Sequence, residues 1–195
     1  AFAEYRDGAW RDPSMTMLGS EQESWLARGF ARDNAVWTVL GSGTNMGYNS
    51  TPEQALDWFP KDAPERNRNY ARQGIAAAKA GLPYNLDNWG GYPAARSRLL
   101  SAAQRADANL VVVTGDSHNG WAFDLPEGGK PAGVEFGGHS VSSPGFESAT
   151  QGTDPLTVAR GLVDANKAEL RWSDTSNRGY MHLSLTPQAA TNEWV

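Results

Sequence analysis

Residues 110–114, LVVVT, form an unbroken apolar run that closely follows a segment with helical spacing, PAARSRLLSAA at 93–103. Such a run is typical of an interior strand in an α/β sheet, because helices cover both faces of that kind of sheet. The helical segment starts with Pro93, whose missing N–H costs nothing in a first turn. This pair of segments predicts an α/β fold.

Other patterns add helices and strands to this unit. Helices are predicted at 20–31, 66–80 and 155–168, and strands at 36–40, 121–125, 133–136 and 180–185. Gly128 and Gly129 predict a hairpin turn at 127–130, Gly41 is expected to end the strand at 36–40, and the residues up to Trp194 are expected to pair with 180–185. With 195 residues and no repeats, 1–195 is predicted to be a single domain.

The composition excludes several functional classes. The chain has 17 Lys and Arg against 22 Asp and Glu, a net charge of −5, and no basic stripe for nucleic acid. It has no cysteine, which excludes disulfides and a cysteine nucleophile, and no window approaches the roughly 18 apolar residues of a membrane span. Because it begins without Met and stops in a strand-like pattern, we expect a piece of a longer protein, lacking mainly its amino-terminal side.

The four residues after the apolar run, Gly115-Asp116-Ser117-His118, allow two chemistries. Ser117 could be the nucleophile of a Gly-Asp-Ser type serine esterase. Such an enzyme needs a histidine base, which in those esterases belongs to an Asp-x-x-His sequence near the carboxyl end. Each of the three histidines of this chain has Gly or Phe three positions earlier. The esterase therefore remains the alternative, without a recognisable base.

Metal binding by Asp116 and His118 is the other interpretation. Two residues apart in an extended turn, their side chains would project to the same side. A carboxylate suits a hard cation, and an imidazole suits iron, zinc or manganese. An Asp-x-His sequence at a strand end is weak evidence for a metal site by itself, since Asp116 could cap a turn and His118 could lie on the surface.

Ordered blocks over most of the chain make the second interpretation more specific: TMLGSEQESWLARGFARDNAVWTVLGS, WGGYPAARSRLL, VVVTGDSHNGWAFDL, VEFGGHSVSSPGFE and RGYMHLSLTPQAATNEWV. Together they resemble the carboxyl-terminal portion of PhoD-like alkaline phosphatase/phosphodiesterases, which belong to the metallophosphoesterase superfamily. The resemblance implies a two-sheet α/β sandwich flanked by helices, of which this chain holds the second half. It also implies hydrolysis of phosphate mono- and diesters, iron and calcium as cofactors, a small phosphate-ester substrate, and a periplasmic or secreted location. Asp116 and His118 match the metal-ligand block.

The resemblance places the family's other ligand blocks upstream of Ala1. The isolated chain is then expected to be inactive unless a second chain carrying the amino-terminal half completes the site. The family commonly has Trp-Asp-Gly-Tyr where this chain has WGGY at 89–92. Because a carboxylate is missing at Gly90, a second alternative stays open: a degenerate family member that binds phosphorylated ligands without turnover.

Three further side chains are candidates for the site. His139 precedes a serine-rich loop and is a candidate substrate-binding residue, although capping of that loop is the alternative. Trp89 and Trp121 lie next to glycine-rich turns and are candidates to line a pocket, whereas a place in the core is the usual one for tryptophan.

Overall fold

The computed structural model describes residues 1–32 and 34–195. Its helices are α1 (Phe2–Asp7), α2 (Ser20–Arg32), α3 (Glu65–Lys79), α4 (Pro93–Arg105) and α5 (Pro155–Ala165), with short 3₁₀ helices η1 (Ala9–Arg11), η2 (Glu53–Trp58), η3 (Trp89–Gly91) and η4 (Phe146–Ser148). Its strands are β1 (Thr38–Ser42), β2 (Leu110–Thr114), β3 (Gly120–Glu127), β4 (Lys130–Gly137), β5 (Leu170–Asp174), β6 (Met181–Leu185) and β7 (Ala190–Trp194). Among these described residues, no helix is both long enough and apolar enough to cross a bilayer.

Five strands form one mixed sheet in the order β1-β2-β4-β3-β5. β1, β2 and β4 are parallel, while β3 runs antiparallel to both β4 and β5. The register pairs Ser42 with Thr114 and Thr114 with Gly137, so the three parallel strands end side by side. The loops that follow these strands consequently meet at one edge of the sheet.

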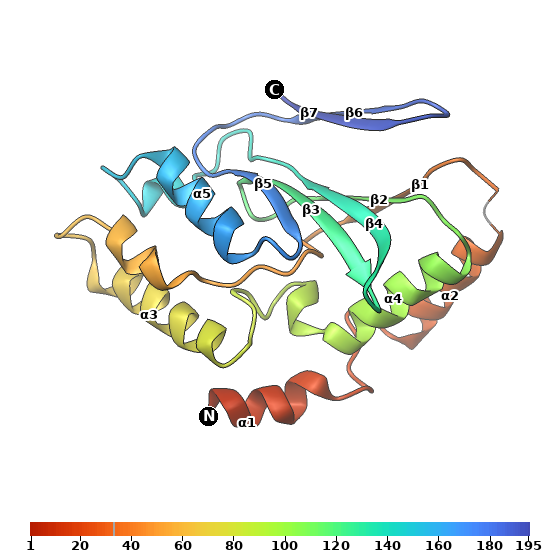
Figure 1. The fold of residues 1–195 in the computed structure, drawn as a ribbon, viewed down its shortest axis with the longest axis horizontal. Coiled ribbons are helices and arrows are strands. Elements are labelled where there is room, and N and C mark those ends of the chain that lie inside the picture. Colours follow the sequence, from red (N-terminus) through yellow and green to blue (C-terminus); the bar gives the residue numbers. More distant parts are fainter. Residues whose placement is uncertain (33) are drawn as a thin grey trace.

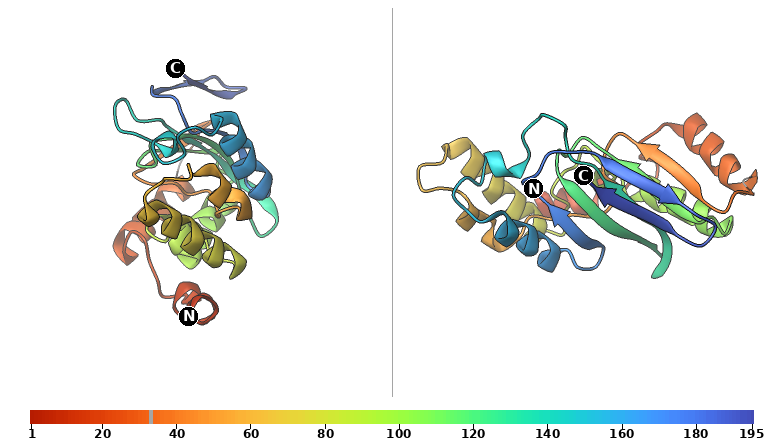
Figure 2. Two further views of the ribbon diagram at one scale, coloured as in Figure 1. Left: turned by 90° about the vertical axis from the view of Figure 1, so that its left-hand side faces the viewer. Right: turned by 90° about the horizontal axis from the view of Figure 1, so that it is seen from above.

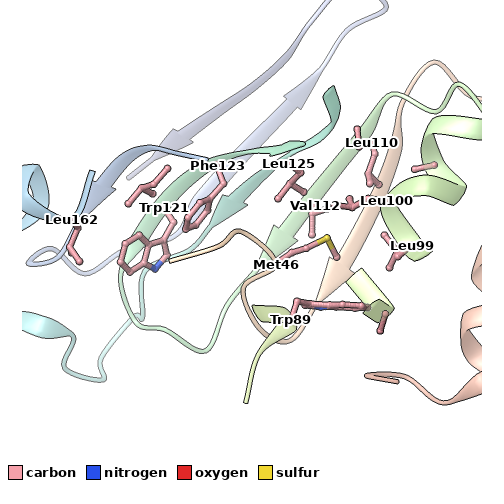
Figure 3. Close-up of a cluster of buried hydrophobic side chains, with 14 of the residues drawn as sticks. Met46, Trp89, Leu99, Leu100, Leu110, Val112, Trp121, Phe123, Leu125 and Leu162 are labelled. Atoms are coloured by element: carbon pink, nitrogen blue, oxygen red, sulfur yellow. The ribbon is translucent and has the colours of Figure 1, made fainter. Parts of the chain in front are cut away.

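Helices α2, α3 and α4 lie on one side of this sheet (Figure 1). Leu100 of α4 is fully buried, and it belongs to the same apolar cluster as Val112 of β2 and Phe123 of β3. Met46 and Trp89, from loops beyond the strand ends, join this cluster (Figure 3). The core of the chain is thus built between the sheet and the helix layer.

The β6–β7 hairpin lies over the opposite side of the sheet (Figures 1 and 2). It is fastened by Trp194, whose ring centroid lies 4.2 Å from that of Trp172 and 5.9 Å from that of Phe136. The Trp194 indole N–H also donates to the carbonyl of Gly137, at 2.8 Å. Aromatic contacts therefore join the hairpin to β4 and β5.

The predicted α/β class is confirmed, as is the helical nature of the four predicted segments, which correspond to α2, α3, α4 and α5. The turn at 127–130 is also confirmed, with Gly128 and Gly129 at φ 58° and 74°, and β7 pairs with β6 as expected. The expectation that Gly41 ends its strand is wrong, because Gly41 pairs with Val113 inside β1. Strand β5 was not predicted. The described second layer is a two-stranded hairpin, so the complete two-sheet sandwich and the single-domain boundary stay predictions.

Candidate functional site

Three loops gather at the carboxyl ends of the parallel strands: 43–49 after β1, 115–119 after β2 and 138–145 after β4. In open α/β sheets this edge is where ligands bind. The loops contact one another through the side chain of Asn45, which donates to the Thr114 hydroxyl at 3.1 Å, and through Gly138, whose N–H donates to the Thr114 carbonyl at 2.9 Å. The end of β2 is therefore the centre of this edge.

Asp116 and His118 have left-handed backbone conformations, with φ of 67° and 59°. A hydrogen bond of 2.8 Å from the Ser117 N–H to the Gly115 carbonyl closes a three-residue turn around Asp116. Asp and His enter this region more readily than most residues, yet two such positions in one short loop indicate a conformation fixed by its surroundings. The extended turn expected from the sequence is therefore wrong, whereas the metal-ligand role of the two side chains stays a prediction.

Asp116 is exposed and lines a mainly polar cavity of about 210 Å³ at this edge. Side-chain amides make up much of the wall: Asn45, Asn49, Asn85 and Asn88. Ser117 and four aromatic rings complete it: Tyr84, Trp121, Phe123 and Phe146. Asp116 is the one charged residue of this described lining. Amide N–H groups and a carboxylate give the cavity both donors and an anionic ligand.

His118 is half-buried, and its Nδ1 lies 3.0 Å from the carbonyl oxygen of Pro144. A neutral imidazole makes this hydrogen bond by donating its Nδ1–H, which leaves the Nε2 lone pair free to accept a proton or bind a metal. The described wall of the polar cavity includes Asp116 and Ser117 but not the His118 imidazole. The structure thus fixes the ring through Nδ1 without placing it in the cavity.

The hydroxyl of Ser117 is held by Trp121, whose indole N–H donates to Ser117 Oγ at 2.6 Å. The hydroxyl also donates to the Asn119 carbonyl at 3.4 Å and accepts from the Asn119 N–H at 3.5 Å. Among the described residues, neither a histidine nor a carboxylate is a hydrogen-bond partner of this hydroxyl. A serine nucleophile needs such a base, so the contacts of Ser117 do not favour the esterase alternative.

A buried carboxylate of β4 joins the loop after β1 to the end of β2. Glu135 of β4 is fully buried and accepts from Thr114 Oγ1 at 2.6 Å, from Asn45 Nδ2 at 2.8 Å, and from the backbone N–H groups of Met46 and Gly47 at 2.9 and 2.5 Å. Burial raises the pKa of Glu135, against these four hydrogen bonds, which lower it. Glu135 therefore fixes Asn45 beside the end of β2.

Comparisons with known proteins decide the family. The PhoD-like phosphatase family matches the chain over residues 2–194. The chain belongs to the PhoD-like phosphatase family. It is 29% identical over 183 residues to alkaline phosphatase D of Bacillus subtilis (strain 168), covering 91% of this chain and 26% of that protein. The fold also matches a solved structure of PhoD with a TM-score of 0.61 and 24% identity, covering 95% of this chain and 33% of that one. The chain thus spans a third or less of the length of these PhoD-like relatives.

The donors at the strand edge fit part of the metal centre that the PhoD-like resemblance predicts. Asp116 offers carboxylate oxygen and His118 offers Nε2, which suit calcium and iron respectively. Across residues 1–32 and 34–195, however, no group of three or more His, Cys, Asp or Glu side chains could hold an ion together. These residues fit as a minority of a ligand set rather than as a complete one.

Gly90, where the resemblance to the PhoD-like family leads us to expect Asp, is buried in η3. Its N–H donates to Asn88 Oδ1 at 2.9 Å, and its carbonyl accepts from the Trp10 indole at 2.8 Å. A Cβ at this position would lie 3.0 Å from Asn88 Oδ1 and from Pro83. An Asp side chain would therefore require the side chains of Asn88 and Pro83 to give way by a few tenths of an ångström, and Asn88 also lines the polar cavity.

His139 is not part of the described wall of the polar cavity. The side chain is 3% exposed, with Nε2 3.6 Å from Asp174 Oδ2 and the ring edge-on to Trp172. Neither ring nitrogen has a hydrogen-bond partner among the described residues, and burial lowers the pKa of His139, against Asp174, which raises it. The predicted substrate contact of His139 stays a prediction.

Of the two tryptophan candidates, Trp121 lines the polar cavity, and Trp89 packs in the core cluster with its N–H donating to Ser42. The sequence analysis missed Glu135 and the asparagines of the cavity wall. An acidic residue inside the apolar run VEFG at 134–137 was the available signal for Glu135. The asparagines lie in irregular loops, where no spacing rule marks them.

Proposed function

We propose that this chain contributes Asp116 and His118 to a metal centre that hydrolyses phosphate mono- and diesters. The observation that carries the proposal is the exposed Asp116 carboxylate in a polar cavity at the carboxyl edge of a parallel sheet, in a chain of the PhoD-like phosphatase family. Iron and calcium are the proposed ions. When bound, such cations supply Lewis-acid polarisation of the phosphoryl oxygens.

The chain's own residues would bind and orient the ester. Amide N–H groups of the other asparagines in the wall can donate to phosphoryl oxygens, whereas both side-chain N–H groups of Asn45 are already taken by hydrogen bonds within the protein. The rings of Trp121 and Phe146 form an apolar part of the same wall and would exclude water from the side of the ester that they contact. His118, held by Pro144, keeps Nε2 available as a ligand.

The proposal includes a second polypeptide, carrying an amino-terminal half, as the source of the remaining ligands. It is supported by the incomplete ligand set of the described residues and by the share of the relatives that this chain spans. A periplasmic or secreted location belongs to the same proposal and rests on the family resemblance alone. His139→Ala, assayed for substrate affinity, tests the separate prediction that His139 binds substrate.

Metal binding by the 195-residue chain tests the proposal directly. We expect Asp116→Asn and His118→Ala each to weaken binding of Fe²⁺ or Mn²⁺, measured calorimetrically, by about tenfold or more. Asp124→Asn and His182→Ala are the matched controls, because both side chains are exposed and lie in ion pairs elsewhere, with Arg171 and Glu193. Equal affinity in all four variants would contradict the assignment.

Hydrolysis distinguishes the three candidate functions. With the amino-terminal polypeptide added, p-nitrophenyl phosphate or bis-p-nitrophenyl phosphate should be cleaved in a chelator-sensitive reaction. Cleavage of p-nitrophenyl acetate that Ser117→Ala abolishes would instead identify the serine esterase. Metal and phosphate binding without turnover of any ester would identify the degenerate family member.

A further inference from the structure

A second cavity, of about 300 Å³, adjoins the polar cavity on the side of α3 and α5. Its wall combines η2, α3, α5 and the segment around η4, and its apolar members include Trp58, Phe59, Ala71, Val158 and Leu162. None of the described lining residues is charged. A phosphate group would gain no charged partner there, whereas an apolar group would leave water.

Three residues, Asn49, Tyr84 and Phe146, line both cavities. Tyr84 and Phe146 meet edge to face with centroids 5.9 Å apart, and Phe146 meets Trp121 in the same way at 6.1 Å. Trp121 in turn holds Ser117, next to Asp116. The aromatic wall is therefore continuous from the loop of Asp116 into the apolar cavity.

The walls of the apolar cavity are held by hydrogen bonds outside it. The Asn166 side chain accepts from the Ser50 N–H at 2.7 Å and donates to Asn49 Oδ1 at 3.1 Å, which ties the segment between the cavities to the end of α5. The Thr153 hydroxyl donates to the Trp58 carbonyl at 2.9 Å. A cavity with fixed walls binds a rigid apolar group without first paying to order them.

We propose that the apolar cavity is a subsite for the aryl or alkyl alcohol portion of a phosphoester whose phosphoryl group lies in the polar cavity. This inference rests on the proposed function. An apolar cavity of about 150 Å³ holds benzene, so 300 Å³ suits a two-ring aromatic group or an alkyl chain of similar volume. Tyr70 and Tyr84, 64% and 50% exposed, both line the cavity, so part of its aromatic wall is open to solvent.

Binding of 1-naphthyl phosphate and methyl phosphate to the 195-residue chain tests the subsite. We expect the naphthyl ester to bind at least about tenfold more tightly, because its rings leave water. Ala71→Phe fills the cavity from α3 and should remove most of this preference. Ala76→Phe makes the same change at an exposed position of α3 that lines neither cavity, and should leave the preference intact.

Tyr70→Ser keeps the test decisive should the filled cavity disturb folding, because Tyr70 is largely exposed. It should weaken the naphthyl ester a few-fold and leave the methyl ester unchanged. Equal affinity for the two esters, or a preference that survives Ala71→Phe in a folded variant, would overturn the subsite. The chain could prefer the naphthyl ester and still hydrolyse neither ester, even with the amino-terminal polypeptide added. That result would support the subsite and contradict only the proposed hydrolysis.

Discussion

The two faces of the five-stranded sheet are covered to different depths. On the helix side, Leu100 and Val112 are fully buried, and even the charged Glu135 has no exposed surface. On the hairpin side, Val39 and Trp172 remain 44% and 37% exposed, and β6–β7 is fastened mainly by aromatic rings. In β4, Glu135 on the helix side is fully buried, whereas its neighbour Phe136 on the hairpin side is only partly buried. The helix side carries the stability that positions the site, and the hairpin side adds a thin cover.

Removal of Glu135 should have the largest effect. Glu135→Ala leaves Thr114, Asn45 and two backbone N–H groups without their acceptor, so we expect a loss of about 4 kcal/mol in the free energy of unfolding. Urea denaturation measures it. Glu135→Gln retains the shape and one of the two acceptor oxygens, each of which accepts two of the four hydrogen bonds, and should cost less; equal losses in both variants would mean that the hydrogen bonds do not matter.

A cavity on the helix side should come next. Leu100→Ala removes a fully buried side chain between α4 and the sheet and should cost about 3 kcal/mol. Val39→Ala, the control on the exposed side of β1, should cost less than about 1 kcal/mol. The same denaturation experiment compares them, and similar losses at the two positions would refute the unequal covering of the faces.

Loss of the ring that fastens the hairpin should have a smaller effect. Trp194→Ala removes the contacts with Trp172 and Phe136 and the hydrogen bond to Gly137, at a cost of about 2 kcal/mol. Hydrogen exchange should accelerate at the paired Tyr180 and Val195 amides while β2 stays protected. Trp25→Ala, at an exposed tryptophan of α2, serves as the control. Acceleration in β2 as well would show that the two faces unfold together.

The smallest expected effect is on the pH dependence of stability. The pKa of Glu135 is raised in the folded chain, so the folded state holds this proton more tightly than the unfolded state does. The stability from this group is full below the unfolded pKa and is lost as pH rises toward the folded value. Relative to Glu135→Gln, the wild type should therefore lose stability as pH rises above the ordinary range of a carboxyl group, which urea denaturation at a series of pH values measures. A difference that grows with pH would show that the hydrogen bonds outweigh burial.

Periodicity in the sequence was enough to predict the helix side of the fold. Apolar spacing located α2 and α4, and the run LVVVT gave β2 with its observed bounds. Strand β5 could not be predicted, because LRWSD mixes charged and apolar residues without clear alternation. The prediction that Gly41 ends β1 failed because a glycine can lie within a strand when the neighbouring strand supplies its hydrogen bonds.

The candidate site was only partly predictable from the sequence. A local motif pointed to Asp116 and His118, but their left-handed backbone depends on contacts with Pro144 and Gly115 that sequence spacing does not encode. The cavity wall is assembled from loops separated by up to about a hundred positions, as the contact of Asn45 with Glu135 illustrates. Such pairings follow from sheet register, which emerges only when the strands are aligned.

The hidden carboxylate of Glu135 has a practical consequence for reading mutational scans of this chain. A screen that scores turnover alone would flag position 135 as strongly as an ion-binding position, although solvent and ester cannot reach it. Scoring abundance alongside turnover would separate the two, because Asp116→Asn, at an exposed position whose left-handed backbone Asn also adopts readily, should leave the amount of folded protein nearly unchanged.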